Sequence, residues 1–195
     1  WGWVSGASML CYISSIILCW LFIRIEQAVP EPIVDLRFFK IPAFMNALLN
    51  NFVIFMGMMG GLFLIPVFAQ TFMGFSATQS GYLFMPMAAA LMIASPIGGA
   101  LTGKFEARYI IFWSTIVAAL GLFLFSFLDA KSGALDIIVP LSVMAFGMGF
   151  GMAQRTNIIA SVVDPKEIGI ASSILALVRN ISGAFGIAIF STILS

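Results

Sequence analysis

The sequence predicts an all-α membrane protein, a polytopic bundle of about six transmembrane helices. Two observations indicate this class. Hydrophobic residues make up 62% of the chain and charged residues only 9%, and most of the charges lie in short connectors between long apolar stretches. Water could not accommodate so much apolar surface on a chain of 195 residues, whereas lipid solvates it directly. The spans must be helices, because a chain in lipid has to satisfy its own backbone N–H and C=O groups and no alternating strand pattern is visible.

A hydrocarbon core about 30 Å thick requires about 20 helical residues per crossing. By this measure the expected spans are residues 4–23, 44–67, 81–101, 110–128, 137–157 and 169–194. The fourth span is the plainest, because only Ser, Thr and Gly interrupt its apolar character. We expect it to lie at the periphery and to face lipid.

The basic residues of the connectors predict the orientation, since Lys and Arg accumulate in cytoplasmic loops. If the spans alternate, only Lys131 falls on the outer side, and both Trp1 and Ser195 lie outside. We expect Arg155 to extend from the end of its span to the cytoplasmic interface. The basic residues on the cytoplasmic side are Arg24, Arg37, Lys40, Lys104, Arg108, Arg155 and Lys166.

Arg179 is the most informative single residue, because it lies near the middle of the last span. An Arg at a helix centre costs about 2.5–3.5 kcal/mol on insertion scales, so its side chain is expected to point into the protein or a watery cavity. Two alternatives stay open for it: an ion pair or carbonyl clamp that locks two helices, or an electrostatic element of a solute or proton pathway. No acidic residue lies in the middle of any span, so we expect no proton-carrying carboxylate in this segment.

Other polar and small residues also lie within the spans. Asn46 and Asn50 are one turn apart, and carboxamides in a membrane either bond to another helix or line water. Ser95, Gly99 and Gly103 recur every four residues, which predicts a face where a neighbouring helix approaches closely. The candidates for lining a solute cavity are Asn46, Asn50, Gly57, Gln154, Arg179 and Asn180. The candidates for helix packing or gating are Gly147, Gly149, Gly151, Gly183 and Gly186.

The composition excludes several functions. The chain has no His, which excludes Ser-His-Asp and Cys-His catalysis and any His-ligated metal within it. Cys11 and Cys19 lie inside the first span, where thiols pack inertly. The net charge of +1 and the lack of a basic patch argue against nucleic acid. We therefore expect neither an enzyme nor a bound metal or cofactor.

Several segments resemble a known family in their order and spacing. They are residues 2–5, residues 32–39, the spaced pattern Pro66, Gln70, Gly74, Ser76, Gly81 and Pro86, the loop containing Gly99, Gly103, Lys104 and Arg108, and the segment from Asp164 to Ala188 that contains Arg179. Together they resemble the C-terminal half of the fourteen-span drug:proton antiporter branch of the major facilitator superfamily. The loop at 99–108 is similar to the second copy of the superfamily's signature cytoplasmic loop. It departs from that loop at Gly103, where an acid is usual, and at Glu106, where a glycine is usual.

The resemblance implies a division of the chain into an extra central transmembrane helix at 1–25, a cytoplasmic linker at 26–42, and five of the six helices of a C-terminal transporter domain at 43–195. Because the chain opens at Trp1 without Met, we expect a fragment. The implied partners are the lipid bilayer, a small-molecule substrate, protons, and the missing N-terminal half of the same polypeptide.

The implied function is secondary active transport in the plasma (inner) membrane, namely proton-coupled export of drug-like or amphipathic small molecules by alternating access. No cofactor is implied. Two alternatives stay open: a facilitator-type importer of a polar metabolite, and a non-transporting membrane scaffold subunit.

Overall fold

The computed structural model describes residues 5–29, 34, 36–129 and 132–194. These residues form helices and connectors, with no strand among them. The α-helices are α1 (Gly6–Glu26), α2 (Pro42–Thr71), α3 (Ala77–Tyr82), α4 (Met85–Ala100), α5 (Ala107–Leu124), α6 (Ala134–Ser161) and α7 (Ile168–Leu194). Three short 3-10 helices accompany them: η1 (Leu36–Lys40), η2 (Phe125–Phe127) and η3 (Pro165–Glu167).

Six helical stretches are long and apolar enough to cross a membrane, which confirms the expected helix bundle. The third of these, Ala77–Ala100, is divided between α3 and α4. Pro86 explains the division, since it stands in the first turn of α4. Its ring would clash with the Tyr82 carbonyl if one helix continued, and it has no N–H to donate to that carbonyl.

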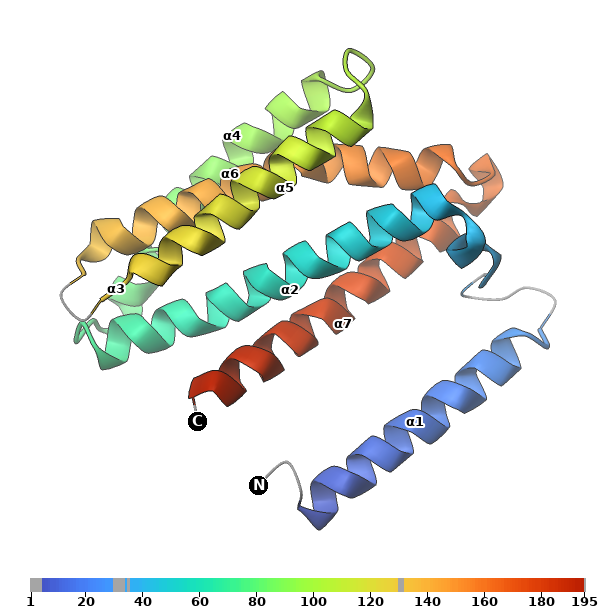
Figure 1. Ribbon diagram of the computed structural model, residues 1–195, viewed down its shortest axis with the longest axis horizontal. Helices are drawn as coiled ribbons and strands as arrows, with labels where there is room; N and C mark the ends of the chain where they lie inside the picture. Colours follow the sequence, from blue (N-terminus) through green and yellow to red (C-terminus); the bar gives the residue numbers. More distant parts are fainter. Residues whose placement is uncertain (1–4, 30–33, 35, 130–131, 195) are drawn as a thin grey trace.

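The chain runs back and forth between two ends of the bundle (Figure 1). The connectors that follow α1, α4 and α6 all lie at one end, and those that follow α2 and α5 lie at the other. Alternation therefore gathers most of the predicted cytoplasmic basic residues at a single end. Lys131, Trp1 and Ser195, on which the prediction for the outer side depends, lie outside the described residues.

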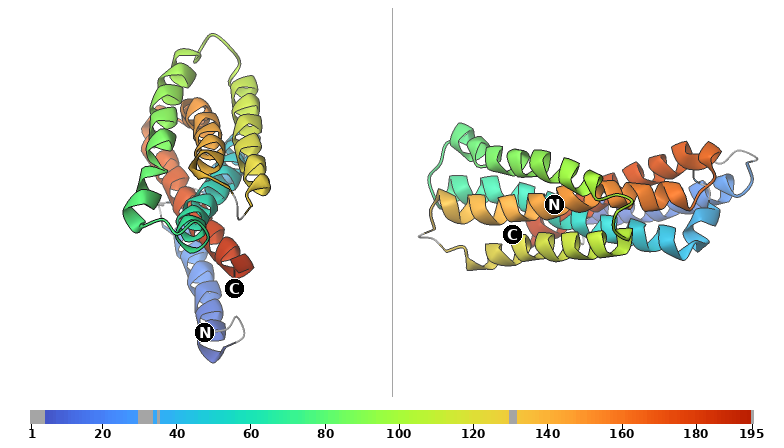
Figure 2. Two further views of the ribbon diagram at one scale, coloured as in Figure 1. Left: turned by 90° about the vertical axis from the view of Figure 1, so that its left-hand side faces the viewer. Right: turned by 90° about the horizontal axis from the view of Figure 1, so that it is seen from above.

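The helices pack in two groups. Helix α6 lies between α4 and α5 (Figure 2, left), while α2 and α7 run side by side (Figure 1). Contacts between α2 and α6 join the groups. Helix α1 lies apart from both, and Glu26 is its only buried residue among those described.

Glycines set the closest approaches between helices. A Cβ on Gly98 would lie 2.0 Å from the Phe150 carbonyl oxygen of α6, and one on Gly186 would lie 2.2 Å from the Met56 carbonyl oxygen of α2. The prediction that Gly99 and Gly103 face a close neighbour is wrong, because nothing lies within 4 Å of a Cβ at either position. The break before α4 leaves Gly98, one residue earlier, facing α6.

Candidate functional site

A buried polar junction lies where α2, α5 and α6 meet. At its centre is Arg155 of α6, whose residue surface is only 3% exposed. Its Nε donates to Asn50 Oδ1 of α2 at 2.7 Å, and its Nη2 donates to Ser114 Oγ of α5 at 3.0 Å. Its Nη1 donates to the Met148 carbonyl at 3.4 Å. We call Arg155, Asn50, Ser114 and Thr115 the Arg155 junction.

The prediction that Arg155 reaches the cytoplasmic interface is therefore wrong. One turn earlier on α6, Gly151 leaves the space that the guanidinium occupies. A Cβ there would lie 2.1 Å from Ser114 Oγ and 2.9 Å from Arg155 Nη1. A guanidinium removed from water needs acceptors, and Asn50, Ser114 and the Met148 carbonyl supply them inside the bundle.

Asn50 extends the junction to a second residue of α5. Its Nδ2 donates to Thr115 Oγ1 at 3.0 Å while its Oδ1 accepts from Arg155. Ser114 and Thr115 each donate their hydroxyl hydrogen to the Ile111 carbonyl at 2.7 Å, which leaves their oxygens free to accept. The structure thus places Asn50 in bonds between helices.

Helix α5 has two different faces. Phe112 and Trp113 are exposed, as expected of a lipid-facing helix, but Ser114 is completely buried. The expectation that this span simply faces lipid is correct for one face only. The hydroxyl groups of the other face belong to the Arg155 junction.

A second polar contact joins α6 to α4. Gln154 is buried, and its Nε2 donates to the Gly98 carbonyl at 3.1 Å and to Thr102 Oγ1 at 2.7 Å. Asn157 Nδ2 also donates to Thr102 Oγ1, at 3.4 Å. In this structure Gln154 therefore satisfies a helix end and does not face open space.

Arg179 of α7 points into the bundle, as expected. Its guanidinium carbon lies 5.0 Å from the centre of the Phe55 ring of α2, a cation–π distance. Its Nε is buried and has no hydrogen-bond partner in the part of the chain that the structure describes. The same holds for Nδ2 of Asn51, a residue that is 1% exposed.

The remaining candidates for a solute cavity lie apart from one another. Asn46 lines a cavity of about 430 Å³ between α2 and α5, together with Asn50, Thr115 and Arg108. Asn180 is exposed on α7. A Cβ on Gly57 would lie 2.9 Å from a methyl carbon of Leu122, so this glycine lies at a helix contact.

The candidate packing glycines all lie at helix contacts. On α6, a Cβ on Gly147 would lie 2.4 Å from the Ala118 nitrogen of α5, and one on Gly149 would lie 3.1 Å from Ala94 Cβ of α4. Gly151 faces Ser114 as described above. On α7, Gly183 faces Met59 and Gly186 faces the backbone of Met56.

The loop that resembles the signature loop lies between α4 and α5. Gly103 has a φ of +81°, a left-handed conformation that glycine adopts without strain. Arg108 forms an ion pair with Glu106 at 2.5 Å, and its guanidinium lies 4.8 Å from the centre of the Tyr109 ring. Gly99 and Lys104 complete this candidate set, and Lys104 is exposed.

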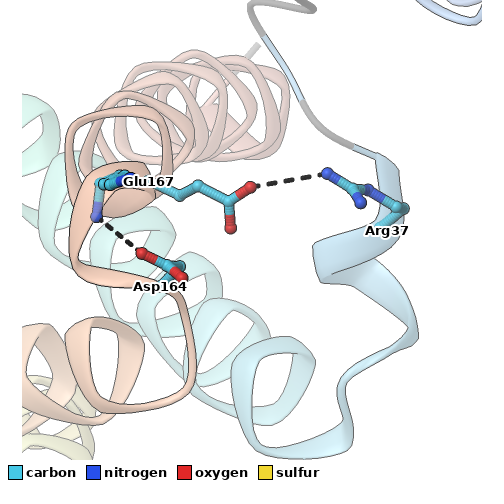
Figure 3. A network of polar contacts seen from close by, with 4 residues as sticks. Arg37, Asp164 and Glu167 are labelled. Carbon is cyan, nitrogen blue, oxygen red and sulfur yellow. Dashed lines mark hydrogen bonds and ion pairs between the residues drawn. The ribbon is translucent and has the colours of Figure 1, made fainter.

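The linker before α2 contacts the start of α7 at the same end of the bundle. Arg37 of η1 and Glu167 of η3 form an ion pair at 3.5 Å, and the Asp164 side chain accepts a backbone hydrogen bond at the start of η3 (Figure 3). Phe38 is buried in an apolar cluster with residues of α2 and α7. The linker is thereby attached to α7 by both charge and apolar contact.

Comparison with known proteins agrees with this architecture. The family described as Major Facilitator Superfamily matches residues 1–187. The chain is 27% identical over 194 residues to the multidrug resistance protein Stp of Mycobacterium tuberculosis, covering 100% of this chain and 36% of that protein. It is 30% identical over 174 residues to the multidrug transporter protein MdtP of Bacillus subtilis, covering 89% and 32%.

A third relative is the lincomycin resistance protein LmrB of Listeria innocua, which is 28% identical over 194 residues, covering 100% of this chain and 41% of that protein. The chain thus spans about two fifths or less of the length of these relatives. Six apolar helices and the family match identify an integral membrane protein. The chain belongs to the Major Facilitator Superfamily.

Proposed function

We propose that this chain is part of a secondary active transporter of the plasma membrane that exports drug-like or amphipathic small molecules in exchange for protons. The observation that carries this proposal is the similarity, along nearly the whole chain, to relatives named for resistance to multiple drugs or to lincomycin. At 27–30% identity this similarity supports drug transport at the level of the family.

We also propose the division of the chain that the resemblance implies. Residues 1–25 would be an extra central helix, 26–42 a cytoplasmic linker, and 43–195 five helices of the C-terminal transporter domain. The separation of α1 from the bundle and the docking of η1 on α7 support this division. The substrate site would form with the N-terminal half of the same polypeptide, near the midplane of the membrane.

Within this half, Arg179 is the proposed electrostatic element of the transport pathway. It lies deep in α7, and a buried nitrogen of its guanidinium has no hydrogen-bond partner among the described residues. Asn46 and Asn180 are the proposed solute-facing amides, because both are exposed on their helices. Gly147, Gly183 and Gly186 are proposed to let α6 and α7 slide against their neighbours during alternating access.

The test uses the full polypeptide that carries this chain, reconstituted in proteoliposomes with an imposed proton gradient. Ethidium is the probe. We expect gradient-dependent ethidium movement that a protonophore abolishes. Arg179→Gln is expected to reduce this flux at least tenfold, and Trp113→Phe, on the exposed face of α5, serves as the matched control and should leave it unchanged.

Other outcomes separate the alternatives. Ethidium flux that ignores the proton gradient would overturn proton coupling. Gradient-independent uptake of a polar metabolite, without ethidium movement, would support the facilitator-type importer. A scaffold subunit would show neither flux, and Arg179→Gln would then alter assembly instead.

A further inference from the structure

Two guanidinium groups, those of Arg155 and Arg179, both contact α2 inside the bundle. Arg155 Nε bonds to Asn50, and the Arg179 guanidinium lies over Phe55. Asn50 and Phe55 are five residues apart on α2, which places the two contacts about 7.5 Å apart along that helix. Two like charges within one bundle repel each other, and removal from water strengthens the repulsion.

Among the residues that the structure describes, no acidic side chain lies in the middle of a span to balance them. The acidic residues that the structure describes all lie at helix ends or in connectors. They are Glu26, Glu106, Asp129, Asp136, Asp164 and Glu167. The two further acids, Glu31 and Asp35, belong to the linker sequence between α1 and α2. Charges inside a membrane protein are normally paired or face water, so a paired state would take its anion from outside these residues.

In the described part of the chain, the buried side-chain polar atoms that lack partners are of one kind. Arg179 Nε and Asn51 Nδ2 are both hydrogen-bond donors, and both are buried. Asn51 and Phe55 lie one turn apart on the same face of α2, and Phe55 is the residue that Arg179 covers. The two donors therefore lie along one strip of the α2 surface, which Arg179 of α7 meets at Phe55. Buried donors that lack acceptors are costly, which indicates that an acceptor belongs there.

We propose that Arg179 and Asn51 form a binding site for a carboxylate. A carboxylate meets both requirements at once, because it accepts hydrogen bonds and carries negative charge. Arg suits this role, since its planar fork matches the two oxygens, and the Phe55 ring holds that plane in place. The proposal rests on the proposed transporter function only for the source of the carboxylate, which is either an Asp or Glu of the N-terminal part of the polypeptide or an anionic solute.

The first experiment measures melting temperatures of the full polypeptide in detergent. Each Asp or Glu in the spans outside this chain is changed to Asn or Gln, alone and together with Arg179→Gln. If the polypeptide supplies the carboxylate, one such acid will show coupling: each single variant lowers the melting temperature by several degrees, and the double variant recovers most of the loss. Two variants serve as controls: Arg179→Lys keeps the charge, and Phe55→Leu removes only the ring. Neither should restore the melting temperature that the acid variant lowers.

The second experiment tests a solute as the source. Benzoate is the probe, and benzamide is its neutral counterpart. If the site takes a solute, benzoate will raise the melting temperature of the unchanged protein but not of Arg179→Gln, and benzamide will raise neither. Asn51→Asp gives an independent check, because it places a carboxylate within the strip. If benzoate raises the melting temperature of the unchanged protein, this variant should remove that effect. If an acid of the polypeptide is coupled to Arg179, this variant should remove that coupling.

Coupling to no acid together with equal responses to benzoate and benzamide would overturn the proposal. The two donors would then be served by water alone, and Arg179 would only pack against Phe55. Neither experiment measures transport. The test of the carboxylate site therefore remains valid even if the transport assay detects no drug export.

Discussion

Arg155 of α6 and Asn50 of α2 are joined by a 2.7 Å hydrogen bond from Nε to Oδ1, and Asn50 in turn bonds to Thr115 of α5. One amide thus connects the α4–α5–α6 group to the α2–α7 group. An apolar cluster of Ile54, Ala118 and Met148 also joins these groups. The Arg155 junction adds directional hydrogen bonds to it and is therefore expected to help determine how the groups are placed relative to each other.

Removing the guanidinium should destabilise the protein. Arg155→Ala leaves Asn50 Oδ1 without its buried donor, so the free energy of unfolding is expected to fall by about 1–3 kcal/mol. Thermal unfolding of the full polypeptide in detergent measures the change. Lys166→Ala is the matched control, since it removes an exposed cation of η3, and equal losses in the two variants would contradict the prediction.

Filling the space at Gly151 should disturb the same junction. In Gly151→Ala the new Cβ would meet Ser114 Oγ at 2.1 Å, and overpacking of this kind costs about 1–3 kcal/mol. The same exchange at Gly61 of α2 meets nothing within 4 Å and should stabilise the helix by up to about 1 kcal/mol. Opposite shifts in melting temperature check the prediction, and a Gly151→Ala protein as stable as Gly61→Ala would refute it.

The turn after α4 should reject a side chain for a conformational reason. At a φ of +81°, Gly103→Ala is expected to cost about 1–2 kcal/mol. Gly103→Asn should cost less, because Asn tolerates this conformation better. Gly99→Ala, which lies in α4 with open space around it, is the control. The melting temperature is expected to be highest for Gly99→Ala, lower for Gly103→Asn and lowest for Gly103→Ala. A reversed order would contradict the left-handed turn.

The ion pair between Arg37 and Glu167 should contribute little to stability. The two side chains are 78% and 32% exposed, so a double-mutant cycle with Arg37→Gln and Glu167→Gln is expected to give a coupling of about 0.2–1 kcal/mol. Added salt should reduce this coupling further. A coupling well above this range, or one that salt leaves unchanged, would show that the contact is shielded from water.

Labelling should place the connectors on opposite sides of the membrane. In a background without Cys11 and Cys19, Lys104→Cys and Lys166→Cys are expected to react with an impermeant maleimide only from the cytoplasmic side. Ser132→Cys, in the connector between α5 and α6, is expected to react only from outside. Labelling of all three from one side would overturn the proposed orientation.

The helices could be predicted from the sequence because the membrane imposes a length and a composition that apolar runs display directly. The inward direction of Arg179 could also be predicted, since the cost of facing lipid decides it. The direction of the Arg155 side chain could not be predicted. Because Arg155 lies near the end of its span, the side chain could extend either outward to the interface or inward into the bundle. Only the space at Gly151 and the hydroxyl of Ser114 on another helix select the inward path, and neither is visible along the sequence.

Helical phase limited the prediction in a similar way. Gly98 and Gly99 are neighbours, and a face drawn through Ser95 and Gly99 differs from the observed one by one residue. The observed face of α4 is the one that packs Gly98 against the backbone of Phe150, and this packing is not visible along the sequence. In the same way, Ser114 and Thr115 are mild exceptions in an apolar run until Asn50 and Arg155 are placed beside them.

The Arg155 junction lies much closer to one end of α2 than to the other. Asn50 lies about 12 Å from the Pro42 end of the helix and about 31 Å from its Thr71 end. A tilt of about 10° around this pivot would carry Thr71 sideways by about 5 Å but Pro42 by only about 2 Å. A small rocking movement would therefore shift the Thr71 end of α2 while the contacts at its Pro42 end stayed almost at rest.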